Sequence, residues 1–541
     1  MFKMGQALYW QGRFQDAIQV WHEGINLFQA LRDSDGVAQL YARSARAVWS
    51  AGDTPGGLRL CREGLAAISG APESPGLALL LHEAARAHLF NGLPAEARQL
   101  CQQALEMAER LGDITVQAEA LATLGLLSDQ PPEAALAALS KAVELAESAG
   151  LLSQAARAHM NLAALMATAM PDFGAARDHY RRAAELHRLR GNTAGALLGL
   201  GGMAGVLLES GSFEEVEATL PVMRQLLNEF ANPGPGAFHI RISEAQLRRY
   251  RGELAEAAQM LQALQTEERQ RGNLQNLVDV NVHLAEVIFA AHVLHDQHGV
   301  GDWADAEAAL EEAIEICDSW SVCGIKPRSL LSMVYTGQGQ FEDARRLLFE
   351  AQEKVDPQPI ASDEGWPSLA EARLAAAEAR WPEALALFKI VAGIYARLGM
   401  RWQRARVLLE WAEAHSARRE PTDLEQARTL LQEASLLFAG MGISFYTNLA
   451  QDRLQTLEIE SYAQALAHQK VDQEMAAAGK IQTGLLPAKP PQIPGWQLAA
   501  TLEPSRQTSG DFYDFIPLPD GRLGIVIADV ADKGAAAALF M

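Results

Sequence analysis

The sequence predicts a mainly α protein, in which a long solenoid of stacked helix hairpins leads into a helical linker and then into the start of an α/β domain. Three observations predict this order. A small residue recurs at intervals of about 40 over residues 1–445, which is typical of a repeat array. Residues 446–487 have helical periodicity with few breaks. From Trp496 onward the apolar period becomes two, so residues 488–541 are expected to contain strands.

The repeat is defined by a small anchor residue near the start of a helix. A bulky or rigid residue lies three positions before ten of the eleven anchors, with Thr54 the exception, and an apolar residue lies four positions after each. Spacings of three and four place these residues on one helix face. The anchors are Ala17, Gly57, Ala97, Ala135, Ala176, Val216, Ala257, Ala306, Ala344, Ala384 and Ala427.

Segments such as GRFQDAIQVW at 12 and GQFEDARRLL at 339 combine a turn glycine with the start of a second helix. Small anchors allow two helices to approach closely, and stacked hairpins bury faces that one hairpin cannot bury alone. The pattern resembles the tetratricopeptide (TPR) family, with a longer period than the usual 34 residues. The resemblance implies a concave groove that binds a protein or peptide.

Local breaks in this pattern predict loops at residues 231–238 and 356–368. Pro221 falls within a helical stretch and is predicted to mark a kink or a late helix start. Met1 leads almost directly into helical periodicity, so the gene is expected to begin further upstream.

Composition excludes several classes of protein. The net charge is −21 and Lys and Arg do not cluster, which argues against nucleic-acid binding. Cys61 and Cys101 occupy the apolar position after two successive anchors, so packing is expected of them; with Cys317 and Cys323 they form no disulfide framework or zinc pattern. The histidines show no ligand spacing. The sequence indicates no membrane span or signal peptide, and a cytoplasmic protein is expected.

The linker, residues 446–487, is predicted to be one helix that ends before Leu486, because Pro487 follows. Its apolar seam indicates either a homodimer through the linker helix or a final capping helix on the array. The sequence leaves both open. The seam consists of Leu454, Leu457, Val471, Met475, Ala478, Gln482 and Leu485.

Two carboxylates are expected to meet in the C-terminal segment. A turn at PDG, residues 519–521, would pair the strands on either side of it. Asp511 lies nine residues before Asp520 and Asp529 nine residues after it, so the two are predicted to lie opposite each other or one place apart. Such carboxylates repel unless they are protonated or bridged by cations such as Mg²⁺ or Mn²⁺. Spacing alone leaves a chance pair of aspartates as the alternative.

The ordered motifs IQTGLLP, SGDFYDF and PDGRLGIVIADVADKG resemble the beginning of a SpoIIE-type domain of the metal-dependent (PPM-type) serine/threonine phosphatases, over about residues 477–541. The resemblance implies an α/β sandwich with two Mn²⁺ or Mg²⁺ ions, held by Asp511, Asp529 and the carbonyl of Val530, and no catalytic residue beyond the metal ligands. Ser509 and Asp532 stand where many relatives have glycine. Such domains need further aspartates later in the domain, so this chain is expected to be a fragment without activity.

The sequence therefore favours a bacterial signalling phosphatase. Its TPR array would sense or dock a partner, and its C-terminal domain would hydrolyse phosphoserine or phosphothreonine on a phosphoprotein, for which the resemblance suggests an anti-sigma-factor antagonist. The alternative is a non-enzymatic TPR scaffold for protein–protein interaction.

Overall fold

The computed structural model covers residues 1–541 and divides them into two compact units, Met1–Gln451 and Asp452–Met541. It describes residues 1–127, 130–228, 234–294, 300–319, 324–353, 363–503, 509, 511–519 and 521–529.

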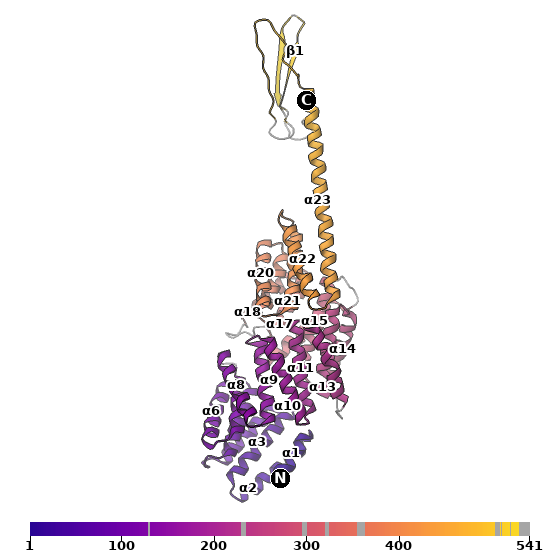
Figure 1. Cartoon of the computed structure of the whole chain (residues 1–541). Helices are drawn as coiled ribbons and strands as arrows, with labels where there is room; N and C mark the ends of the chain where they lie inside the picture. The colour runs from indigo at the N-terminus through magenta and orange to yellow at the C-terminus, as the bar shows by residue number, and fades with distance from the viewer. Residues whose placement is uncertain are drawn as a thin grey trace. The chain divides into compact units, whose positions relative to one another are not determined.

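Unit 1 is an array of helix hairpins, visible from indigo to orange in Figure 1. Each hairpin places an odd-numbered helix before an even-numbered one. The odd-numbered helices are α1 (Phe2–Trp10), α3 (Ser34–Ser50), α5 (Pro75–Phe90), α7 (Ile114–Leu124), α9 (Leu152–Thr168), α11 (Thr193–Ser210), α13 (Gly234–Arg251), α15 (Leu274–Leu294), α17 (Ile325–Gly337), α19 (Gly365–Ala377) and α21 (Arg401–Arg418). The even-numbered helices are α2 (Phe14–Ala30), α4 (Thr54–Ala67), α6 (Pro94–Leu111), α8 (Pro132–Ser148), α10 (Phe173–Leu189), α12 (Phe213–Asn228), α14 (Leu254–Arg271), α16 (Trp303–Ser319), α18 (Phe341–Glu353), α20 (Trp381–Arg397) and α22 (Asp423–Ala439).

The structure confirms the anchor pattern as the basis of a TPR-like solenoid. All eleven anchors are buried. The residue three positions before the anchor is the first residue of its helix in ten repeats, and α22 starts one residue earlier, at Asp423. Left-handed glycines end the preceding helices as expected, for example Gly92 (φ 74°) and Gly339 (φ 78°). Cys61 and Cys101 are fully buried, and burial raises the pKa of the Cys101 thiol to about 12.

Successive odd-numbered helices contact one another along the array, as α3 with α5 and α17 with α19 do. These helices therefore form the inner layer of the curve. The array also returns on itself, because α21 contacts α11: Gln403 Nε2 donates to Glu209 Oε2 at 3.1 Å. The ring centroid of Trp402, on α21, lies 4.5 Å from that of Tyr250, on α13. One turn of the superhelix thus has a closed aromatic interior.

The expectation that no segment could span a membrane needs one correction. By length and composition, α11 is long and apolar enough to cross a membrane. More than half of it is buried within the array, where it packs against α10, α12 and α13. Its apolar surface is therefore used in the core of unit 1.

Three local predictions also need correction. Helix α12 continues through Pro221, so this residue does not mark a late start. Residues 234–238 of one predicted loop belong to the first turns of α13, and residues 365–368 of the other begin α19. The remaining residues 231–233 and 356–362, and Cys323, lie outside the described residues.

The linker forms a single helix, α23 (Ser444–Leu485), and Leu486 lies beyond it as predicted. Its first turns belong to unit 1, where Tyr446 is 1% exposed and Ala450 is fully buried. The capping interpretation therefore holds for the start of α23. The later part of the helix belongs to unit 2.

Unit 2 contains an antiparallel hairpin of β1 (Asp511–Pro517) and β2 (Leu523–Asp529). Alternating apolar residues and the PDG turn explain why these segments pair. Among the described residues these are the only two strands, so the sandwich implied by the phosphatase resemblance is not seen in them.

Candidate functional site

The hairpin brings the two predicted carboxylates directly opposite each other. Asp511 pairs with Asp529 in the register of β1 and β2, and both residues are exposed. Directly opposed residues on antiparallel strands point to the same face, with Cβ atoms about 5 Å apart. The register deduced from the turn is therefore confirmed, while the metal-ligand role of these residues stays a prediction.

Helix α23 fixes the backbone just before Asp511. The side-chain amide of Gln482 donates from Nε2 to the carbonyl of Ser509 at 2.5 Å and accepts from the Ser509 N–H at 2.9 Å. Ser509 Oγ in turn accepts from the backbone N–H of Asp511 at 3.0 Å. We call this arrangement the Gln482 clamp. It connects the last turns of the linker helix to the first carboxylate of the pair.

The chemistry of this donor set fits a hard divalent cation. Carboxylate oxygens are the ligands that Mg²⁺ and Mn²⁺ prefer, and an exposed pair leaves room for water and for additional ligands. Val530, the third predicted ligand, lies outside the described residues, as do Gly510 and Asp532.

The face of the hairpin that carries the two carboxylates also carries large apolar side chains. Residues Tyr513, Phe515, Ile525 and Ile527 share a face with the two aspartates by strand alternation. Ile525 is 56% exposed and Ile527 is 82% exposed. Large apolar side chains at this level of exposure are expected where another layer packs.

Replacing Gln482 by alanine is expected to free the backbone around Ser509. The variant leaves two backbone groups without their side-chain partner, which costs about 1–3 kcal/mol locally. Amide hydrogen exchange at Asp511 should accelerate. Gln473→Ala, on an exposed position of the same helix, provides the matched control and should leave this exchange unchanged. Unaltered protection in Gln482→Ala would show that the clamp does not hold the strand.

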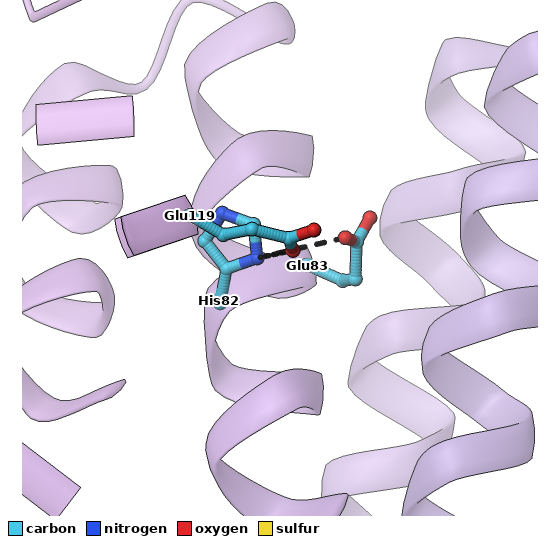
Figure 2. Close-up of side chains that lie close together, drawn as sticks. All are labelled: His82, Glu83 and Glu119. Atoms are coloured by element: carbon cyan, nitrogen blue, oxygen red, sulfur yellow. Dashed lines mark ion pairs between the residues drawn. The ribbon is translucent and has the colours of Figure 1, made fainter. Parts of the chain in front are cut away.

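A second cluster of ligand-type side chains lies inside unit 1. His82 and Glu83 of α5 and Glu119 of α7 point toward one another, and all three are buried (Figure 2). His82 Nδ1 lies 3.3 Å from Glu119 Oε2 and 3.6 Å from Glu83 Oε1. The spacing of the histidines in the sequence does not indicate this grouping, because Glu119 lies on a different helix from His82.

Arginine already neutralises this cluster. Arg46 of α3 donates to both Glu83 and Glu119, and Arg86 donates to Glu83 at 3.0 Å. Burial by itself would raise the pKa of Glu83, but these two arginines hold that pKa at about 2. Burial lowers the pKa of His82. A metal ion would have to displace Arg46, so the cluster is best explained as a charge network that joins neighbouring repeats.

The sequence contains an indication of this network that the anchor pattern does not use. Arg46, Glu83 and Glu119 lie on three consecutive inner helices, 37 and 36 residues apart, which is slightly less than one repeat. Charged residues that recur at about this spacing on inner helices are therefore candidates for ion pairs between neighbouring repeats.

The predicted seam of α23 is only partly free. Ala478 is 6% exposed and Gln482 is 2% exposed, because both are covered within unit 2. They are not available to a second chain in this structure. The exposed apolar side chains of the helix include Ile459, Tyr462 and Leu466, which follow steps of three and four.

Comparisons with known proteins identify one family model and two relatives, each of which matches a part of the chain. Residues 78–215 match the family described as soluble NSF attachment protein, SNAP, over less than half of the chain. Protein IcfG of Synechocystis sp. is 48% identical over 68 residues, which is 13% of this chain and 11% of that protein. The phosphoserine phosphatase RsbU of Bacillus subtilis is 38% identical over 73 residues, which is 14% of this chain and 22% of that protein. The chain thus spans less than a quarter of either relative.

Solved structures resemble the chain in fold alone. The human IFIT1 dimer with PPP-AAAA has a TM-score of 0.43 and 14% identity. The match covers 78% of this chain and 91% of the IFIT1 chain. Yeast Tom70 has a TM-score of 0.34 and 14% identity, and the match covers 89% of this chain and 98% of the Tom70 chain. The helix hairpins and their buried anchors make unit 1 a TPR-like helical repeat array.

Proposed function

We propose that this protein is a bacterial signalling protein in which the TPR-like array controls a metal-dependent serine/threonine protein phosphatase. The observation that carries the proposal is the direct opposition of Asp511 and Asp529, with the Gln482 clamp beside it. The similarity to RsbU, a phosphoserine phosphatase by name, supports the same reaction class.

In this proposal, Asp511, Asp529 and the carbonyl of Val530 would hold Mn²⁺ or Mg²⁺, and the bound metal would supply a water nucleophile for phosphoester hydrolysis at neutral pH. The residues of this chain orient the ions and neutralise their charge. The substrate is a phosphoserine or phosphothreonine on a partner protein, with an anti-sigma-factor antagonist as the candidate. The reaction is expected to occur in the cytoplasm.

The array supplies the docking function. Its inner layer is built from successive odd-numbered helices, which is the layer that repeat proteins present to ligands. A protein or peptide is the proposed occupant. The exposed stripe Ile459, Tyr462 and Leu466 of α23 is the proposed contact for a second copy of the chain, which sedimentation equilibrium would detect as a dimer.

The second candidate is a non-enzymatic scaffold. It is favoured by the large share of the chain in the array and by the presence of only two strands among the described residues. The two candidates differ in one assay. Manganese-dependent phosphate release from para-nitrophenyl phosphate is expected of the complete gene product if it is the phosphatase. No release would favour the scaffold.

A further inference from the structure

Arginines gather on the inner helices of the first repeats of unit 1. All of them are half-buried, and we call them the arginine cluster. The cluster consists of Arg43 and Arg46 of α3, Arg86 of α5 and Arg157 of α9. The charges of Glu83 and Glu119, on the intervening helices α5 and α7, act on the pKa of both Arg43 and Arg157. The four arginines therefore converge on the same two glutamates.

Two members of the cluster have neutral hydrogen-bond partners in place of carboxylates. Arg43 Nη1 donates to Gln6 Oε1 at 2.5 Å, and Arg157 Nη2 donates to Thr123 Oγ1 at 2.6 Å. Neither arginine forms an ion pair with another described residue, and Arg43 Nε is buried without an acceptor among these residues. Their charges are therefore not offset locally.

The cluster carries an excess of positive charge, because four arginines face two glutamates. Burial alone would raise the pKa values of Glu83 and Glu119, but the arginines hold them below the usual range, so both acids are ionised. Burial lowers the pKa of His82, which is therefore neutral at pH 7. Burial, with Arg86 adding to it, lowers the pKa of Arg157 to about 10, which leaves Arg157 protonated. Water cannot offset a half-buried excess of charge, whereas an anion can.

This part of the inner layer is also open to a ligand. The side chain of Arg46 is 31% exposed, so the cluster is in contact with solvent. In the closed turn of the superhelix, by contrast, the space lined by Arg249, Arg373 and Arg406 is about 10 Å³, which holds at most one water molecule. A larger ligand is therefore expected at the arginine cluster.

We propose that the arginine cluster binds the phosphate group of a phosphoserine or phosphothreonine on the docked partner protein, with Arg43 and Arg157 as the main contacts. Such a phosphate carries a charge of about −1.5 to −2 at pH 7 and three strong acceptor oxygens, so one group matches the excess of the cluster. A single carboxylate supplies half of that charge. The planar guanidinium also fits phosphate in a bidentate way.

The inference rests on the docking function proposed for the array and is independent of hydrolysis at the hairpin. A phosphate bound by Arg43 and Arg157 would connect α3 with α9, two helices that are three repeats apart. The array would thereby distinguish the phosphorylated partner from its dephosphorylated form.

The test is fluorescence anisotropy with the 541-residue chain and a rhodamine-labelled peptide that carries one phosphoserine among glycines and alanines. No metal is added, so the result is separate from that of the phosphatase assay. The phosphoserine peptide is expected to bind saturably, and at least about 10-fold more tightly than the same peptide with serine or with glutamate at that position. Equal affinities for the three peptides, or no binding, would overturn the proposal.

Inorganic phosphate, added as a competitor, separates the two possible sources of the phosphate group. It is expected to bind at least about 10-fold more weakly than the phosphoserine peptide, because it lacks the contacts that a peptide makes with the inner layer. An equal affinity would contradict the assignment to a side chain of a partner protein.

Arg157→Met is the decisive variant and should weaken binding of the phosphoserine peptide by at least about 10-fold. The fold should persist, because the partner that Arg157 loses is the Thr123 hydroxyl. Arg181→Met is the matched control: Arg181 lies on α10, is 45% exposed and pairs with Asp178, so affinity should not change. Wild-type affinity in Arg157→Met would refute the site. If circular dichroism shows that this variant is unfolded, Arg43→Met is measured with the same expectation.

Discussion

Asp529→Asn is expected to abolish manganese-dependent phosphate release by the complete gene product, with a loss of at least about 100-fold. The substitution replaces one of two directly opposed carboxylates by a neutral amide of the same size. The remaining Asp511 cannot hold a bridged pair of cations alone. The rate of para-nitrophenyl phosphate hydrolysis at saturating Mn²⁺ measures the loss.

The matched control for this prediction is Asp514→Asn. Asp514 is an exposed carboxylate on the same strand, but it alternates to the opposite face from Asp511. Its substitution should leave the rate within a few-fold of wild type, and neither variant should alter the helix content by circular dichroism. Equal rates for Asp529→Asn and wild type would refute the ligand assignment.

Glu286→Gln is expected to lower the free energy of unfolding of the array by about 3–5 kcal/mol. Glu286 is 5% exposed and pairs with the buried Arg249 and with Lys326. Burial alone would raise the pKa of Glu286, but the charges of Arg249 and Lys326 hold it well below its usual range. The amide would leave both cations without a counter-charge in the interior.

Urea unfolding followed by circular dichroism measures this effect. The control is Glu244→Gln, which breaks the pair of Glu244 with Arg224, whose side chain is 56% exposed. Surface pairs contribute about 0–1 kcal/mol, so its midpoint should move little. Similar shifts for the two variants would mean that the Arg249–Glu286 pair contributes no more than a surface pair.

The repeat array could be predicted from the sequence because its determinants are local and recur. An anchor such as Ala176, with Phe173 before it, specifies a helix start and a buried face within a few residues. The hairpin register could be predicted for a similar reason, since the turn at PDG fixes which residues face each other. In both cases the interacting residues are close in sequence or follow a fixed period.

The features that sequence reasoning missed depend on contacts between distant segments. The closure of α21 on α11 joins Gln403 to Glu209, and no local pattern indicates which repeat completes a superhelical turn. The Gln482 clamp could not be predicted because Gln482 falls in the apolar seam of α23, which indicates either a dimer contact or a capping helix. Its observed partner is the backbone of Ser509.

The most direct test of the proposed metal site is the number of Mn²⁺ ions that the complete gene product binds, counted by electron paramagnetic resonance. Two ions per chain are expected for the wild type. The double variant Asp511→Asn, Asp529→Asn should bind neither ion tightly, whereas Asp514→Asn should bind both. Two tightly bound Mn²⁺ ions in the double variant would contradict the assignment of Asp511 and Asp529 as the ligands on which the proposed function rests.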